Sequence, residues 1–288
     1  MQAREGLAVS VCHRCDGLGV VFRPAGSTVE AAVCECSERC RTCGDARYLF
    51  ERDAAAREIA RMCDCERRRV RVRLYNEARV PAKYADAVLN ERYRDRHNQE
   101  AFHTLRLFLS EYQRGHKGLL VMGPPGTGKT WLVAAFIREL VFQHGVPVVF
   151  RDFFHLLSDL RSGYSNDTPE SQLIDPLVAV EVLVIDELGK GRNTPWEQNI
   201  LDVIISQRYN NRKTTIFTSN YTDSRRTTLA ESFRPKDAPS ARREELEIKD
   251  TLPERVGSRI YSRLKEMCDF IPLVGPDRRD LEGTAGLP

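Results

Sequence analysis

The chain has 288 residues, of which 41% are hydrophobic and 30% are charged. Its 44 basic and 41 acidic residues leave a net charge of +3, so a basic site for nucleic acid would have to be a local patch. No apolar run approaches the roughly 18 residues of a membrane-spanning helix, and residues 1–6 lack the apolar segment of a signal peptide. We therefore expect a cytoplasmic protein without a membrane partner.

Eight of the nine cysteines lie between residues 12 and 65, and their spacing repeats. Each of two units has a C-x2-C pair followed, 18 or 19 residues later, by a C-x-C pair. In a cytoplasmic protein this pattern indicates metal ligands rather than disulfides. Four thiolates close a tetrahedral zinc site. We therefore predict two structural zinc ions, one held by Cys12, Cys15, Cys34 and Cys36, the other by Cys40, Cys43, Cys63 and Cys65.

Three alternatives remain for these cysteines. Four thiolates also bind iron–sulfur clusters, and the thiols could instead be free or redox-active. The pairing is also open, because Cys34, Cys36, Cys40 and Cys43 are close enough in sequence to form one site. The ninth cysteine, Cys268, stands in an apolar helical context, which predicts a small buried side chain.

Residues 66–79 carry six arginines and two glutamates. Two interpretations are equally supported: a phosphate-backbone contact, or a solvated helix that links two domains. We predict a cysteine-rich zinc-binding region with this basic linker over residues 1–79. An ATPase domain is predicted over residues 80–288.

Residues 123–130 match G-x-x-x-x-G-K-[ST], the phosphate-binding loop. An apolar strand, 118–122, precedes the loop, and a helix begins at about Trp131. Backbone N–H groups and the positive end of the helix would hold the phosphates of ATP. Lys129 would reach the β- and γ-phosphates, and the Thr130 hydroxyl would bind Mg²⁺. The predicted nucleotide-binding residues of this loop are Gly123, Pro124, Pro125, Gly126, Thr127, Gly128, Lys129 and Thr130.

Strands and helices alternate through the rest of the chain, with strands at 146–151, 182–187 and 214–219 and a helix at 153–160. This alternation predicts an α/β domain with a parallel sheet flanked by helices. A capping box at Thr194–Glu197 predicts the start of another helix.

Polar residues follow two of the predicted strands. Asp186 ends the strand at 182–187 and would bind Mg²⁺, while the adjacent Glu187 would act as the general base toward water. Asn220 follows the strand at 214–219. It would hydrogen-bond the γ-phosphate or the attacking water, unless it is only a turn residue.

Residues 123–130, 186–189, 208–210 and 218–220 together resemble AAA+ ATPases of the DnaC/DnaI/IstB group. That group comprises bacterial replicative-helicase loaders and transposition helper ATPases, and the resemblance covers residues 80–280. It implies self-association through the ATPase domain. It also implies two arginine roles, for which three arginines are candidates. Arg263 resembles the arginine finger that reaches a neighbouring subunit's nucleotide, with Arg259 as its rival, and Arg278 resembles the sensor 2 arginine.

The chain departs from this group in two places. Residues 223–250 hold 14 charged residues among 28, which predicts a mobile surface insertion. The cysteine unit is doubled, whereas loaders of the DnaI type carry one zinc module.

Three functions follow as hypotheses. The first is a loader that places a replicative helicase on single-stranded DNA. Its zinc region would grip the helicase. The second is a transposition helper ATPase, and the third is a zinc adaptor that binds ATP without hydrolysing it.

Overall fold

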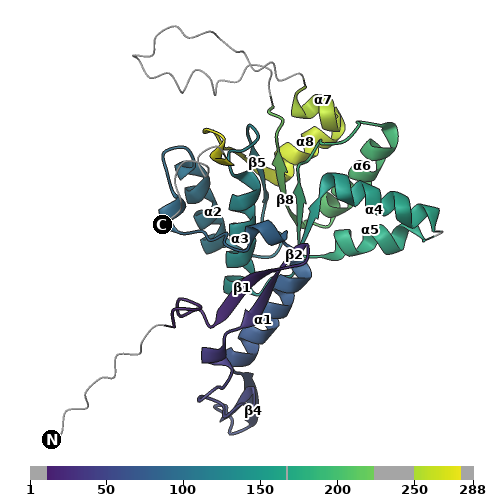
Figure 1. Ribbon diagram of the computed structural model, residues 1–288. Helices are drawn as coiled ribbons and strands as arrows, with labels where there is room; N and C mark the ends of the chain where they lie inside the picture. Colours follow the sequence, from purple (N-terminus) through teal and green to yellow (C-terminus); the bar gives the residue numbers. More distant parts are fainter. Residues whose placement is uncertain (1–11, 167, 224–249, 280–288) are drawn as a thin grey trace, which may run out of the picture. The chain divides into compact units, whose positions relative to one another are not determined.

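The computed structural model describes residues 12–166, 168–223 and 250–279 (Figure 1). The chain separates into two compact units, residues 1–86 and 87–288. The boundary predicted from the sequence lies after residue 79. Residues 80–86 group with the first unit because Val29 N–H donates to the Val80 carbonyl at 2.7 Å and Thr28 bridges Pro81. The predicted charged insertion lies almost wholly outside the described residues.

Two antiparallel hairpins and one long helix form the first unit. Asn76 of the helix exchanges two hydrogen bonds with the backbone of Ala31 in the first hairpin, at 2.7 and 3.0 Å. Tyr75, which is buried, packs edge-to-face on Phe22 at 5.1 Å. The elements of this unit are β1 (Val20–Ala25), β2 (Thr28–Val33), η1 (Glu35–Ser37), β3 (Tyr48–Arg52), β4 (Glu58–Met62), α1 (Asp64–Ala78) and η2 (Ala82–Tyr84).

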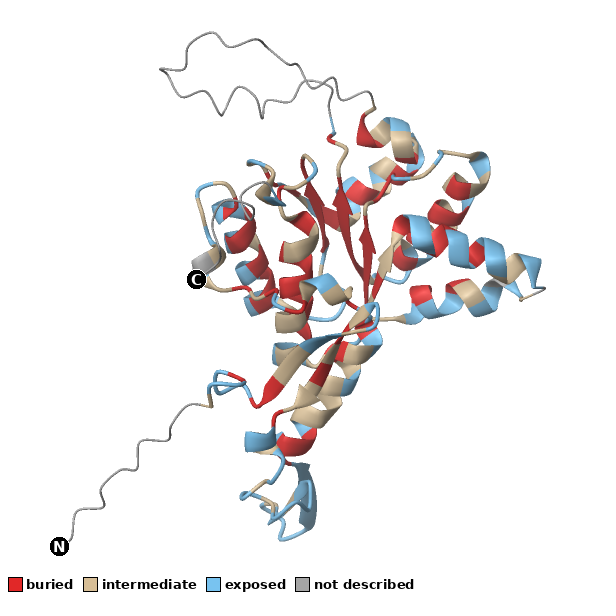
Figure 2. Ribbon diagram, viewed as in Figure 1, coloured by how far each residue is buried: buried red, intermediate tan, exposed pale blue. Residues whose placement is uncertain are grey.

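The two hairpins differ in burial. Helix α1 covers the first, whereas nearly every residue of β3 and all of β4 is exposed (Figure 2). A two-stranded hairpin without a covered face is marginal in water. The second hairpin therefore needs another source of stability, and the cysteines at its ends are the nearest candidates.

The second unit contains a five-stranded sheet in the order β6-β7-β8-β5-β9. Every neighbouring pair is parallel, so the predicted parallel α/β class is confirmed. All residues of the three central strands are buried, as expected for a parallel sheet covered on both faces. The strands are β5 (Gly118–Met122), β6 (Val148–Asp152), β7 (Val182–Asp186), β8 (Thr214–Ser219) and β9 (Cys268–Pro272).

Helices cover both faces of this sheet, with α2 and α3 on one side and α4, α5 and α6 on the other (Figure 1). The capping box predicted at Thr194 is confirmed, because Thr194 and Glu197 exchange both of its hydrogen bonds. The helices are η3 (Glu91–Tyr93), α2 (Gln99–Glu111), α3 (Lys129–His144), α4 (Phe153–Ser165), α5 (Glu170–Ala179), α6 (Pro195–Asn210), α7 (Leu252–Val256) and α8 (Ser258–Met267).

Strand β9 corrects one prediction. Cys268 is buried as predicted, but it begins a strand rather than lying in a helix. A short apolar run is ambiguous between helix and strand in sequence alone. Pairing with β5 decides the matter, because the backbone of residues 268–272 completes the edge of the sheet.

Candidate functional site

The phosphate-binding loop connects β5 to α3 and contacts the residues that follow β9. Gly126 and Gly128 adopt the left-handed conformation, with φ of +80° and +93°. This conformation is open to glycine at little cost. At Gly123 a side chain would collide with the carbonyl oxygen of Leu273, so only glycine fits there. The loop and the start of α3 therefore have the backbone that a phosphate cradle requires.

Lys129 is held beneath the loop. It is only 7% exposed, and its Nζ donates to the carbonyl oxygens of Gly123 and Pro124, each at 2.8 Å. Burial lowers the pKa of Lys129 to about 8, and the nearby carboxylates of Asp186 and Glu187 counteract part of this effect. The ammonium group is thus positioned at the loop, where phosphate oxygens would be stronger partners than the two carbonyls.

Thr130 and Asp186 meet at the end of β7. The Thr130 hydroxyl donates to Asp186 Oδ1 at 2.9 Å, and Thr218 donates to the same oxygen at 2.5 Å. Burial raises the pKa of Asp186, while these two hydrogen bonds oppose the rise. A hydroxyl and a carboxylate are hard oxygen ligands of the kind that Mg²⁺ prefers. Both predicted magnesium ligands therefore lie together and fit the ion.

Glu187 turns away from the line of its strand. Its φ is +57°, an unusual value for a residue other than glycine, and its N–H donates to Thr218 Oγ1 at 2.9 Å. The carboxylate pairs with Lys190, and this hydrogen bond raises the pKa of Lys190. The carboxylate of Glu187, the predicted general base, is therefore held in an ion pair by a lysine from its own loop.

Asn220 directly follows β8, which lies between β7 and β5 in the sheet. It is half-buried and shares the carboxyl edge of the sheet with Asp186 and the phosphate loop. An amide at this position could contact phosphate or water, and this role of Asn220 stays a prediction.

The predicted arginines fall into two groups. Arg278 lies on the phosphate loop, where its N–H donates to the Gly126 carbonyl at 2.9 Å and its guanidinium bonds Thr127 O at 3.3 Å. Arg263 and Arg259 lie on α8 and instead face Asp202 of α6, at 2.5 and 3.7 Å. Arg263 is mostly buried in this pair, whereas 73% of the Arg259 side chain is exposed.

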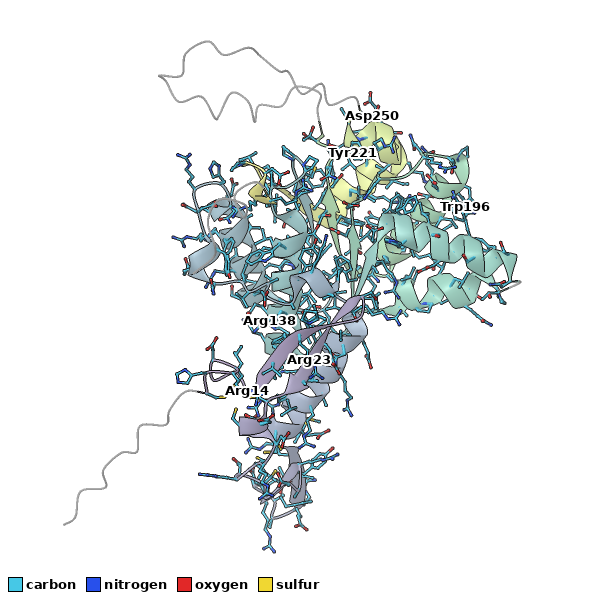
Figure 3. All side chains as sticks on the ribbon, viewed as in Figure 1. Arg14, Arg23, Arg138, Trp196, Tyr221 and Asp250 are labelled. Carbon is cyan, nitrogen blue, oxygen red and sulfur yellow. The ribbon has the colours of Figure 1, made fainter. Side chains whose placement is uncertain are left out.

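Sequence reasoning missed several residues of the site. Thr218 ties Asp186 and Glu187 together, and its signal was its place at the start of the polar run Thr218–Asn220 that ends the strand. Arg255 donates to the carbonyl of Gly189 at 2.9 Å and also bonds Gly191. Its guanidinium stacks on Tyr221, labelled in Figure 3, at 5.1 Å. Arg255 thereby holds the segment that follows Glu187, and nothing local in the sequence indicated this.

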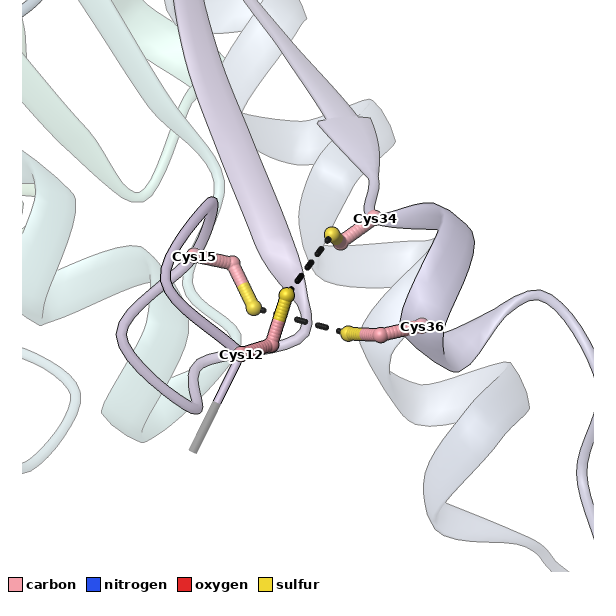
Figure 4. Close-up of side chains that lie close together, drawn as sticks. All are labelled: Cys12, Cys15, Cys34 and Cys36. Carbon is pink, nitrogen blue, oxygen red and sulfur yellow. Dashed lines mark hydrogen bonds between the residues drawn. The ribbon is translucent and has the colours of Figure 1, made fainter. Parts of the chain in front are cut away.

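The eight cysteines of the first unit form two clusters, with the predicted pairing (Figure 4 shows the first). Within the first, the sulfur atoms of Cys12 and Cys34 are 3.9 Å apart and those of Cys15 and Cys36 are 3.5 Å apart. The matching distances in the second cluster are 3.7 and 3.5 Å. A tetrahedral site with metal–sulfur bonds of about 2.3 Å places its sulfurs about 3.8 Å apart. Both clusters thus fit a duplicated zinc module.

Backbone N–H groups point at these sulfurs. Gly19 N–H donates to Cys15 Sγ at 3.3 Å. A backbone hydrogen bond from Arg14 is the main cause that lowers the pKa of Cys12 to about 7, and one from Cys43 lowers that of Cys40 to about 6. Such bonds favour the thiolate, which is the form that binds metal. The clusters could therefore hold metal ions.

Among the residues that the structure describes, no helix is both long enough and apolar enough to cross a membrane.

Comparison with known proteins then identifies the family. Residues 60–227, more than half of the chain, match the family described as IstB-like ATP binding protein. The chain belongs to this family. The predicted membership in the DnaC/DnaI/IstB group of AAA+ ATPases is confirmed, and the phosphate loop lies inside the matched region.

Individual relatives support the same placement. An uncharacterized protein of Bacillus subtilis, YqaM, is 24% identical over 79% of this chain and 67% of its own length. The replicative helicase loader DnaC of Escherichia coli is 30% identical over 40% of this chain, and the match spans about half (47%) of DnaC. The crystal structure of the DnaC helicase loader superposes with a TM-score of 0.54 and 26% identity, covering 67% of this chain and 99% of that one.

Proposed function

We propose that this protein is an ATP-hydrolysing replication factor that loads a replicative helicase onto single-stranded DNA. The observation that carries the proposal is the meeting of Lys129, Thr130 and Asp186 at one edge of the sheet, in a chain similar to a helicase loader. Residues separated by 56 positions lie within 2.9 Å of each other there. Such convergence supports a nucleotide site with its magnesium ligands in place.

Each residue of the site then has a role. Lys129 would exchange its two carbonyl partners for phosphate oxygens, while Thr130 and Asp186 would hold Mg²⁺. The ion, when bound, neutralises charge on the phosphates. Glu187 would accept a proton from water once Lys190 has released it, and Asn220 would orient that water. Arg278 would complete the site from within the same chain.

Full activity would need a second copy of the chain. Neither Arg259 nor Arg263 faces its own phosphate loop, which suits an arginine that acts on a neighbour's nucleotide. Arg263 would first have to leave Asp202, whereas Arg259 is already exposed. An arginine finger in trans makes hydrolysis depend on assembly, and assembly could then depend on the helicase or on DNA.

The two cysteine clusters would each bind one zinc ion. The ions would be structural, since four thiolates leave no open position for water. The zinc region, residues 1–79, would provide the surface that grips the helicase.

Two experiments test this function. The first captures the host's replicative helicase with the full chain and with a chain that lacks residues 1–79. Loss of capture on truncation is expected, and absence of capture by both chains would remove the loader hypothesis. The second measures ATPase activity against protein concentration, with and without single-stranded DNA. A specific activity that rises steeply with concentration is expected from a finger in trans.

The second candidate function is that of a transposition helper ATPase. The match to the family described as IstB-like ATP binding protein supports this candidate. Its ATPase residues would be the same, so they do not decide between the two. The similarity to a helicase loader and the cysteine units favour the loader. A transposase gene beside the gene for this protein, or capture of a transposase in place of the helicase, would favour the helper. A zinc adaptor without hydrolysis ranks third, because Lys129, Asp186 and Glu187 are all present.

A further inference from the structure

The turn that follows Glu187 is held by a side chain from a distant part of the second unit. Arg255 donates to the Gly189 carbonyl oxygen from Nε at 3.0 Å and from Nη2 at 2.9 Å, and Nη2 also donates to the Gly191 carbonyl. The planar guanidinium offers such donors in a rigid fork, which a lysine ammonium lacks. The carbonyls on both sides of Lys190, the partner of Glu187, therefore converge on one guanidinium group.

The same guanidinium is also fixed beside the loop that follows β8. Its central carbon lies 5.1 Å from the ring centre of Tyr221, the residue after Asn220, and it pairs with Asp250 at 3.4 Å (Tyr221 and Asp250 are labelled in Figure 3). Only 16% of the Arg255 side chain is exposed. A side chain at Gly189 would meet the Tyr221 ring at 3.1 Å and Arg255 Cβ at 3.2 Å, so the two loops pack closely here. Arg255 thus joins the loop of the predicted general base to the loop of the predicted water-orienting amide.

Arg255 lies on α7, which is joined directly to the helix that carries the two finger candidates. Gly257, with φ of +83°, is the single residue between α7 and α8. The two short helices share one buried apolar cluster, to which they contribute Leu252, Val256, Ile260 and Leu264. Closely packed interiors transmit displacement from one element to the next. A shift of α8 is therefore passed to α7 and to the guanidinium of Arg255.

We propose that Arg255 is a positioning residue for hydrolysis, which sets the places of Glu187 and Asn220 in its own chain and couples them to α8. The inference rests on the proposed ATP hydrolysis with a finger in trans. When α8 engages a neighbour's nucleotide, its position becomes fixed, and Arg255 passes that position to the general base of the same chain. Each site then depends on both neighbours, because one supplies its finger and the other fixes its α8. Small displacements of catalytic groups are enough for such control.

The first measurement separates positioning from nucleotide binding in the full-length chain. Among the described residues, Arg255 has no bond to the phosphate loop, so Arg255→Gln should keep the Kd for ATP within about two-fold while kcat falls by about 10². Arg255→Lys keeps the charge without the fork, and its kcat should stay at least about ten-fold below the parent. Arg192→Gln, an exposed arginine in the same turn, is the control and should leave kcat unchanged. Parent kcat in either Arg255 variant would overturn the proposal.

Mixed assemblies decide whether Arg255 acts in its own chain or on a neighbour. Arg255→Gln and Glu187→Gln chains are mixed in equal amounts, and the mixture should stay as inactive as either chain alone. If Arg255 acted in trans, the Glu187→Gln neighbour would supply it, and a recovery of at least about ten-fold would overturn the proposal. The control mixtures use Arg259→Gln and Arg263→Gln in place of Arg255→Gln. The one that lacks the finger should recover activity, because its neighbour supplies that arginine.

Hydrogen exchange reports on the turn without reference to hydrolysis. In the nucleotide-free chain, the amides of residues 188–193 should exchange at least about ten-fold faster in Arg255→Gln than in the parent, whereas those of α4 should not change. Equal exchange of the turn in both chains would overturn the proposal, even if kcat fell. A parent chain that does not hydrolyse ATP would remove the proposed function together with this inference. A parent that hydrolyses ATP beside an unaffected Arg255→Gln chain would remove this inference alone.

Discussion

The two units hold their functional residues in different ways. Around the phosphate loop, every residue of β5 and β7 is buried, and the sheet itself presents Lys129 and Asp186. Around the second cysteine cluster, the strands are exposed along almost their whole length. One site is supported by packing, whereas the other has little packing and would depend on a metal ion held by its cysteines. The comparison indicates that the two units should fail under different treatments.

Metal removal is the largest effect we expect. Structural zinc contributes on the order of 10 kcal/mol to the folding of small metal-binding domains, and the first unit has little core to replace it. A strong chelator should unfold the cysteine region, made visible by rapid proteolysis within residues 12–63. Nucleotide affinity of the second unit should stay within about two-fold. A simultaneous loss of nucleotide binding would break the contrast between the units.

The second effect is on chemistry. Glu187→Gln should preserve ATP binding and lower the hydrolysis rate by about 10² to 10⁴, the usual contribution of a general base. Lys190→Met is the matched control, because Lys190 pairs with this carboxylate and in the proposed function would release it before hydrolysis. That variant should hydrolyse ATP at least as fast as the parent chain. Equal losses in both variants would show that the pair has a structural role.

The third effect probes the packing of the second unit. Arg208 is completely buried and donates to the carbonyls of Leu177, Val180 and Thr214 at 2.6 to 2.9 Å. Burial lowers its pKa to about 10, so it stays charged at neutral pH. Arg208→Met leaves these acceptors without partners and should cost about 3 kcal/mol or more of unfolding free energy.

Denaturant titration of the second unit's transition measures this loss, with the exposed Arg192→Met as control. A midpoint equal to that of the control would mean that apolar packing alone supports the sheet.

The smallest effect is a pH dependence of nucleotide binding. Since the pKa of Lys129 is lowered to about 8, its neutral fraction grows above pH 8. Phosphates prefer the ammonium form, so ATP affinity should fall by up to about ten-fold per pH unit beyond that point. Lys129→Arg, which remains charged, should bind with a flat profile.

Stability of the nucleotide-free chain should respond with the opposite sign. The folded pKa of Lys129 lies below the ordinary value of 10.5, so the unfolded chain binds more protons between pH 8 and 10.5. The contribution of this group to unfolding free energy therefore rises with pH across that window. Comparing denaturant midpoints of the parent and Lys129→Arg chains isolates it. A parallel pH response of the two chains would contradict the buried-lysine interpretation.

Local motifs explain which parts of the site were predictable. The phosphate loop needs glycine where its backbone is in the left-handed conformation, as at Gly126 and Gly128. Its glycine spacing can therefore be recognised within eight consecutive residues. The cysteine pairing was readable because the same spacing occurs twice. Cys268 was predicted in a helix, because residues 268–272 are too few to show a clear period, and only the pairing with β5 makes them a strand.

Contacts between distant segments were not readable. The pairing of Glu187 with Lys190 accompanies a positive φ at Glu187, and nothing in the sequence predicts that backbone conformation for a glutamate. The support of this loop by Arg255 joins residues 66 positions apart.

The sequence by itself determined the family, the parallel α/β class of the second unit and the two groups of four cysteines. These features depend on spacing along the chain, which folding does not change. The tertiary structure decided which side chains are free to act. It buried Lys129 and lowered its pKa, paired Glu187 with Lys190, placed Arg259 and Arg263 against Asp202, and left Tyr48 and Phe50 exposed. Those outcomes depend on burial and on through-space charge, and both arise only when separate segments pack together.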